Sequence, residues 1–131
     1  MGLYSLGKRY KLCSKVMIEE LFKSGTTIKS YPLIAIFNEV TFTDDVSFKI
    51  VFSAPKRTFR KAYQRNRIKR ICKEAVRLNK AIIETYLTEN NKQLALFLVY
   101  SSKDELNHVQ LEKKVVKLFN ELIKSLHESN K

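Results

Sequence analysis

One stretch of the chain, residues 56–80, constrains the fold most, because it is both strongly basic and patterned as a helix. It reads KRTFRKAYQRNRIKRICKEAVRLNK and holds 11 of the 25 Lys and Arg residues, with Glu74 as its only acid. Eleven cations less one acid give this stretch a net charge of +10, out of +12 for the whole chain. At about 100° per residue, one helix face collects Ile68, Ile71, Cys72, Ala75, Asn79 and Ile82. The opposite face collects Asn66, Lys69, Arg70, Lys73, Arg77 and Lys80. The pattern predicts a helix that packs one face on a core and presents positive charge on the other.

An ordinary solvent-exposed helix face is the simpler interpretation, but such faces usually mix both signs of charge. Here only Glu74 is available, so the cations repel one another unless a polyanion neutralises them. We therefore interpret the face as a nucleic-acid binding surface. Composition alone fits a ribosomal or general RNA-binding protein equally well. A DNA-binding regulator that inserts this helix in a major groove is disfavoured, because a strand rather than a partner helix precedes it.

The length of 131 residues predicts a single domain over residues 1–131, with a basic N-terminal arm at 1–12. No run of roughly 18 apolar residues is present, and the first residues lack the apolar segment of a signal peptide. The two cysteines, Cys13 and Cys72, have no Cys or His at metal-ligand spacing, and Cys72 is expected in the core. We expect a cytoplasmic protein with no membrane partner and no small-molecule substrate.

Helix and strand patterns alternate along the rest of the chain. Ser14 is a candidate N-cap for a helix that runs to about Ser24 and stops at Gly25. Residues 26–53 have a strand pattern that Pro32 interrupts. The apolar runs 33–37 and 48–52 flank the polar turn 41–45, and we expect them to form an antiparallel hairpin.

The basic helix is predicted to continue to about Tyr86, followed by a turn at Asn90-Asn91. Residues 93–100 are a strongly apolar strand, and a capping box of Asn107 and Gln110 starts the last helix. The order is α-β-β-β-α-β-α. We predict an α+β fold, a two-layer α/β sandwich with about four strands in a central sheet.

The basic stretch resembles the signature of the bacterial ribonuclease P protein component. Residues 65–70, Arg-Asn-Arg-Ile-Lys-Arg, match that signature at six consecutive positions, with Ala62 before them and Glu74 after them. Tyr63 stands where the family usually has Val, and Lys73 stands where it has Arg. Membership would imply the sandwich above with a left-handed βαβ crossover around the basic helix, whereas pattern rules alone favour the right-handed form.

The resemblance also implies a function. The protein would be the RNA-binding subunit of ribonuclease P, an endoribonuclease that removes the 5′ leader of precursor tRNA by phosphodiester hydrolysis. Its partners would be the catalytic RNA and precursor tRNA. Catalysis would belong to the RNA, which would bind the magnesium ions (Mg2+), and the protein alone would be inactive. The protein would aid leader binding and the folding of the RNA.

By the same resemblance, Arg65, Asn66, Arg67, Lys69 and Arg70 contact the RNA subunit. The basic stretch adds as candidate RNA-binding residues Lys56, Arg57, Arg60, Lys61, Lys73 and Arg77. Asn66 could instead bond to local backbone at the helix entry. A cleft for the single-stranded leader would be formed by Lys11, Ile18, Phe22 and Ile36. For these apolar side chains, core packing is the alternative.

The sequence itself offers no catalytic constellation. Its acids are dispersed in pairs at 19–20, 44–45 and 104–105, and its two histidines, His108 and His127, lie 19 positions apart on one predicted helix. A protein nuclease needs clustered carboxylates for metal ions or a paired general acid and base. We therefore predict no catalytic residue and no metal ligand in the protein.

Overall fold

The computed structural model describes residues 10–12, 14–103 and 106–129. Most of the predicted N-terminal arm, Cys13 and the acidic pair at 104–105 lie outside these ranges. The elements are, in chain order, α1 (Lys15–Ser24), β1 (Thr26–Ser30), β2 (Leu33–Val40), β3 (Phe48–Ser53), α2 (Ala62–Asn79), α3 (Ala81–Glu89), β4 (Gln93–Tyr100) and α4 (His108–Ser129). Within these ranges, no helix has both the length and the apolar run needed to cross a bilayer.

The four strands form one mixed sheet in the order β1-β2-β4-β3. β1 pairs with β2, and β2 with β4, in antiparallel fashion, whereas β3 and β4 are parallel. The predicted split at Pro32 is confirmed, since β1 ends at Ser30 and β2 begins at Leu33. The predicted hairpin between β2 and β3 is wrong, because β4 lies between them.

The reason for this insertion lies in β4 and in the connection before β3. β4 is the most apolar strand, and a central position buries it on both sides. The first residue of β4, Gln93, forms hydrogen bonds to the connection between β2 and β3 at the end of the sheet. The Gln93 amide nitrogen donates to the carbonyls of Asp44 and Val46 at 2.9 and 2.8 Å, and its oxygen accepts the Phe42 N–H at 2.9 Å. The connection between β2 and β3, which includes the expected polar turn, also buries two apolar side chains, Phe42 and Val46.

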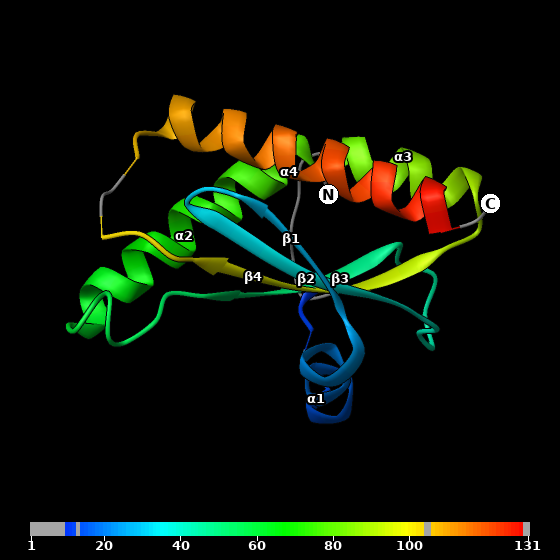
Figure 1. Ribbon diagram of the computed structural model, residues 1–131, viewed down its shortest axis with the longest axis horizontal. Helices are drawn as coiled ribbons and strands as arrows, with labels where there is room; N and C mark the ends of the chain where they lie inside the picture. Colours follow the sequence, from blue (N-terminus) through cyan, green and yellow to red (C-terminus); the bar gives the residue numbers. More distant parts are fainter. Residues whose placement is uncertain (1–9, 13, 104–105, 130–131) are drawn as a thin grey trace.

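Figure 1 shows α2, α3 and α4 on one face of the sheet and α1 on the other. The main core lies under the three helices and includes Leu33, Phe48, Leu96, Ile68 and Phe119. The predicted α+β class with a four-stranded central sheet is confirmed. β3, the two following helices and β4 form the expected parallel βαβ unit. The left-handed sense of this crossover stays a prediction of the resemblance.

α1 begins as predicted, with the Met17 N–H donating to the Ser14 hydroxyl at 3.3 Å. It also ends as predicted at Gly25, but for a different reason than a left-handed backbone. Gly25 has an extended conformation with φ of −70°. A Cβ at this position would lie 2.4 Å from the Leu21 carbonyl oxygen and 2.7 Å from the Ile36 side chain. Glycine is needed here because the end of α1 passes so close to β2.

The single long helix expected to reach about Tyr86 is two consecutive helices, α2 and α3, that meet at Lys80. The turn that follows α3 is confirmed, with Asn91 in the left-handed region at φ of 54°. The capping box before α4 is also confirmed. The Gln110 N–H donates to the Asn107 side chain at 2.8 Å, and the Asn107 N–H donates to the Gln110 side chain at 3.2 Å.

Candidate nucleic-acid interface

The segment between β3 and α2 is a tight turn that is anchored on the core by one aromatic ring. The N–H groups of Thr58 and Phe59 donate to the Pro55 carbonyl at 3.1 and 2.9 Å. The Phe59 side chain is buried and its ring lies 5.9 Å from that of Tyr100. The buried Phe59 ring anchors the turn on the core. The cations of the turn are exposed to solvent, namely Lys56, Arg57 and Arg60.

Arg65 joins this turn to the start of α2. Its Nη1 atom donates to the carbonyls of Phe59 and Arg60, both at 2.9 Å. The N-cap residue Lys61 adds a backbone N–H that donates to the Gln64 side chain at 3.4 Å. Arg65 is half-buried and therefore has a structural task that its sequence pattern did not indicate. Its contact with RNA stays a prediction.

The apolar face of α2 packs as predicted. Ile68, Cys72 and Ala75 are buried in the main core. Burial raises the pKa of the Cys72 thiol to about 12, so this cysteine is a core side chain and a poor nucleophile near neutral pH.

The opposite side of α2 and the turn before it form a cationic surface that we call the basic ridge. It consists of the exposed side chains of Lys56, Arg57, Arg60, Lys61, Arg70 and Lys73. Arg67 and Lys69 are half-buried on the same helix. Asn66 is exposed among them. The described residues give its side chain no hydrogen-bond partner, so the structure does not support the alternative of a bond to local backbone.

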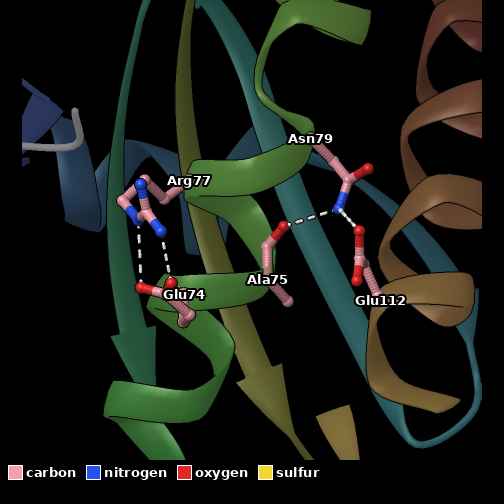
Figure 2. A network of polar contacts seen from close by, with 5 residues as sticks. All are labelled: Glu74, Ala75, Arg77, Asn79 and Glu112. Carbon is pink, nitrogen blue, oxygen red and sulfur yellow. Dashed lines mark hydrogen bonds and ion pairs between the residues drawn. The ribbon is translucent and has the colours of Figure 1, made fainter. Parts of the chain in front are cut away.

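Toward the end of α2, the cation Arg77 is paired within the helix. Its guanidinium contacts the Glu74 carboxylate through two nitrogens, and the Nε–Oε2 distance is 3.0 Å (Figure 2). The hydrogen bond from Arg77 holds the pKa of Glu74 below its ordinary value and raises the pKa of Arg77. The one acid of the basic stretch is therefore engaged by Arg77 and does not neutralise the ridge.

Asn79, the polar exception on the apolar face of α2, connects two helices. Its side-chain nitrogen donates to the Ala75 carbonyl at 2.8 Å and to the Glu112 carboxylate on α4 at 3.3 Å (Figure 2). The Asn79 side chain can be partly buried at the border between α2 and α4, because these two partners accept its hydrogen bonds.

The prediction that Lys80 lies on the exposed basic face is wrong, because its side chain is only 8% exposed. The helix is interrupted at this residue, so the periodicity of α2 no longer gives its direction. Its ammonium lies 3.4 Å from the Glu84 carboxylate, donates to the Tyr10 hydroxyl at 3.1 Å and sits 4.6 Å above the Tyr10 ring. The other Glu84 oxygen accepts from the hydroxyls of Tyr10 and Ser47 at 3.2 and 3.4 Å.

The four residues predicted to line a leader cleft lie at α1 and the sheet. Ile18 and Ile36 are half-buried and pack against a small cluster that includes Leu12 and Leu21, which supports core packing for both. Phe22 is 60% exposed and meets Phe97 edge-on at 5.0 Å. Lys11 is exposed and forms an isolated bridge with Ile50 at the β3 edge.

We call Ile18, Phe22, Ile36 and Phe97 the α1-side surface. Phe97 was missed by the sequence reasoning, although the alternation along β4 places it on the face opposite to its buried leucines. Among the described residues, no group of three His, Cys, Asp or Glu side chains lies close enough together to hold a metal ion.

The model of the family described as Ribonuclease P matches residues 6–123, most of the chain. This chain belongs to the ribonuclease P protein family. The ribonuclease P protein component of Porphyromonas gingivalis is 32% identical over 104 residues, which cover 79% of this chain and 74% of the relative. That of Borrelia hermsii is 35% identical over 99 residues, covering 76% and 79%.

The fold agrees with this assignment. The solved ribonuclease P protein of Thermotoga maritima superposes with a TM-score of 0.67 at 18% identity, over 83% of this chain and 94% of the other. In this member of the ribonuclease P protein family, the six matching residues 65–70 lie in the first half of α2, and Arg70 among them is part of the basic ridge.

Proposed function

We propose that this protein binds the catalytic RNA of ribonuclease P through the basic ridge, and that the RNA performs the hydrolysis that removes the 5′ leader of precursor tRNA. One observation carries the proposal beyond family membership. The ridge exposes six cations, while Glu74, the one acid of the stretch, is engaged by Arg77. A surface of this kind is suited to phosphate oxygens, which arginine and lysine neutralise.

We assign the hydrolysis to the RNA because the described side chains offer positive charge rather than paired acid and base groups. Asp44 forms an ion pair with Lys49 at 3.6 Å, and Glu39 one with Lys92 at 2.8 Å. These carboxylates serve local structure. In our proposal the magnesium ions are bound by the RNA, and the protein acts in the cytoplasm by orienting and stabilising that RNA.

The α1-side surface is the proposed contact for the single-stranded leader. Phe22 and Phe97 give it two aromatic rings in contact, and Phe22 is largely exposed. Aromatic rings bind single-stranded RNA by stacking on bases. Ile18 and Ile36 contribute apolar contact but do not stack on bases. Attraction between the leader phosphates and cations such as Lys11 therefore provides a larger share of the leader affinity than it would if these two side chains were aromatic.

Reconstitution tests the proposal directly. RNA that copurifies with the native protein is sequenced and transcribed, and cleavage of a precursor tRNA is measured with protein alone, RNA alone and both together. We expect cleavage only when the RNA is present, with stimulation by the protein at low magnesium. Cleavage by the protein alone, or no stimulation of a verified cognate RNA, would refute the proposal. Copurification with ribosomes and no effect on leader removal would indicate a general RNA-binding protein.

A further inference from the structure

Tyr63 lies in the first turn of α2 with 60% of its surface exposed. A single exposed aromatic side chain is common on protein surfaces and means little alone. Tyr63 is unusual in its surroundings, because the ammonium of Lys61 lies 5.8 Å from the centre of its ring.

The positions around Tyr63 on the helix are cationic or polar. Asn66 and Arg67 follow it by three and four positions, so these side chains neighbour it on the helix surface, and the exposed Arg60 lies in the segment just before the helix. Within the described part of the chain, the Tyr63 hydroxyl has no hydrogen-bond partner. An exposed ring with an available hydroxyl therefore stands next to the basic ridge.

This combination matches one kind of ligand. Cations bind phosphates whatever the base sequence, whereas an aromatic ring binds the flat face of a base. Bases within a duplex already stack on one another, so only an unpaired base can offer its face. An acidic protein surface would match the cations but would leave the ring without a specific partner.

We propose that Tyr63 stacks on an unpaired RNA base whose flanking phosphates lie on Lys61 and the neighbouring arginines. The inference rests on the proposed function and adds to it the class of nucleotide that this part of the ridge recognises. The Lys61 ammonium, 5.8 Å from the ring centre, brings a positive charge next to the face of the ring, where the phosphate beside a stacked base would lie.

A fluorescence experiment reports on this residue alone, because the chain contains no tryptophan. Tyr63→Trp places a single fluorophore at the site, and Val109→Trp, at a position 62% exposed in the first turn of α4, is the matched control outside both proposed RNA surfaces. Each variant is titrated with a short single-stranded oligoadenylate and with an RNA duplex of equal length. We expect saturable quenching of Tyr63→Trp by the single strand but not by the bound duplex, and little quenching of the control. Equal quenching by both RNAs, or none with RNA bound, would overturn the proposal.

Affinity provides a second measurement in the full protein. Tyr63→Leu should weaken binding of the copurified RNA by about fivefold to a hundredfold, whereas Tyr63→Phe keeps the ring and should stay within a few-fold of the original protein. The slope of log affinity against log salt should not change, because stacking releases no counterions. If Tyr63→Leu lowers this slope by one unit and Tyr63→Phe binds RNA no better than Tyr63→Leu, then Tyr63 has only an electrostatic or structural role.

The two proposals can fail separately. If the protein stimulates leader removal but Tyr63→Leu binds RNA normally, the stacking inference is wrong and the proposed function stands. If Tyr63→Trp is quenched by the single strand but the protein never stimulates a verified cognate RNA, the base contact stands and the proposed function is wrong.

Discussion

The N-terminal and C-terminal ends of α2 contain the same kinds of cation in different environments. Near the start, Lys61 and Arg70 project into solvent as part of the basic ridge. Near the end, Arg77 is held by Glu74, and Lys80 just beyond the helix is buried against Glu84 and Tyr10. Charge at a helical position therefore does not by itself indicate a binding surface. The position of the nearest acid and the continuity of the helix decide whether a cation stays exposed or supports the fold.

The largest effect is expected from removing three exposed cations of the ridge. The combined variant Arg60→Ala, Arg70→Ala and Lys73→Ala should lower the slope of log affinity against log salt by about 2–3 units, because each lost phosphate contact contributes nearly one. Affinity near physiological salt should fall about a hundredfold. The free energy of unfolding should change by less than about 1 kcal/mol, because the three side chains are exposed. Binding is measured across a salt series, and stability by urea unfolding.

A matched control removes the same charge from α4. Lys113, Lys117 and Lys124 are also exposed, and their combined replacement by Ala lowers the net charge equally. We expect a much smaller change in slope from this variant. Equal changes for the two triple variants would mean that net charge, rather than the ridge, governs RNA binding.

An intermediate effect, on stability, is expected from Lys80→Met. It removes the ammonium that neutralises the Glu84 carboxylate, and we expect a loss of about 2–3 kcal/mol in the free energy of unfolding. This is below the range for fully buried pairs, since the Glu84 side chain is 28% exposed and keeps its hydroxyl donors. The salt slope of RNA binding should be unchanged. Lys73→Met is the control and should show the reverse pattern, with stability unchanged and binding weakened.

The smallest effect is expected from Glu74→Gln, which removes the carboxylate that contacts Arg77. RNA affinity should rise a few-fold, because α2 loses a negative charge beside its cations. Glu39→Gln changes the net charge identically in the remote pair with Lys92 and should leave affinity unchanged. A similar rise in both variants would show that Arg77 is not in the binding surface.

The same variant has a pH signature. The pKa of Glu74 is lowered in the folded protein, so its ionised form stabilises the fold above the ordinary carboxyl pKa, and this contribution is lost as pH falls through the lowered value. Urea midpoints should therefore differ slightly between the original protein and Glu74→Gln near neutral pH and converge in acid, once the pH lies below the lowered pKa of Glu74. A difference that persists in acid would contradict the assignment.

Local patterns predicted the elements well. Ser14, Asn107 and Gln110 cap helices as their spacing indicates, and Cys72 lies on the buried face that periodicity gave it. Pairing of the strands was predicted less well, because the hairpin rule assumes that neighbours in sequence pair in the sheet. β4, a distant and more apolar strand, took the place between β2 and β3.

The candidate nucleic-acid interface shows the same difference between local patterns and contacts of distant segments. The cationic signature and the six-residue match in residues 65–70 were visible in the sequence. Only the structure revealed the backbone contacts of Arg65, the contact between Phe22 and Phe97 and the exposure of Tyr63. These features depend on which residues from distant segments meet, and a repeat along one helix carries no information about that.

Patterns in the sequence were enough to place most of the helices and strands and the apolar face of α2, and they predicted a polyanion for the opposite face. Those outcomes depend on residues within a few turns of one another, where periodicity and capping act directly. Contacts between distant segments settle which strand lies at the centre of the sheet and which cations remain exposed. Lys80 is buried because Tyr10, 70 residues away in sequence, and Glu84 converge on its ammonium.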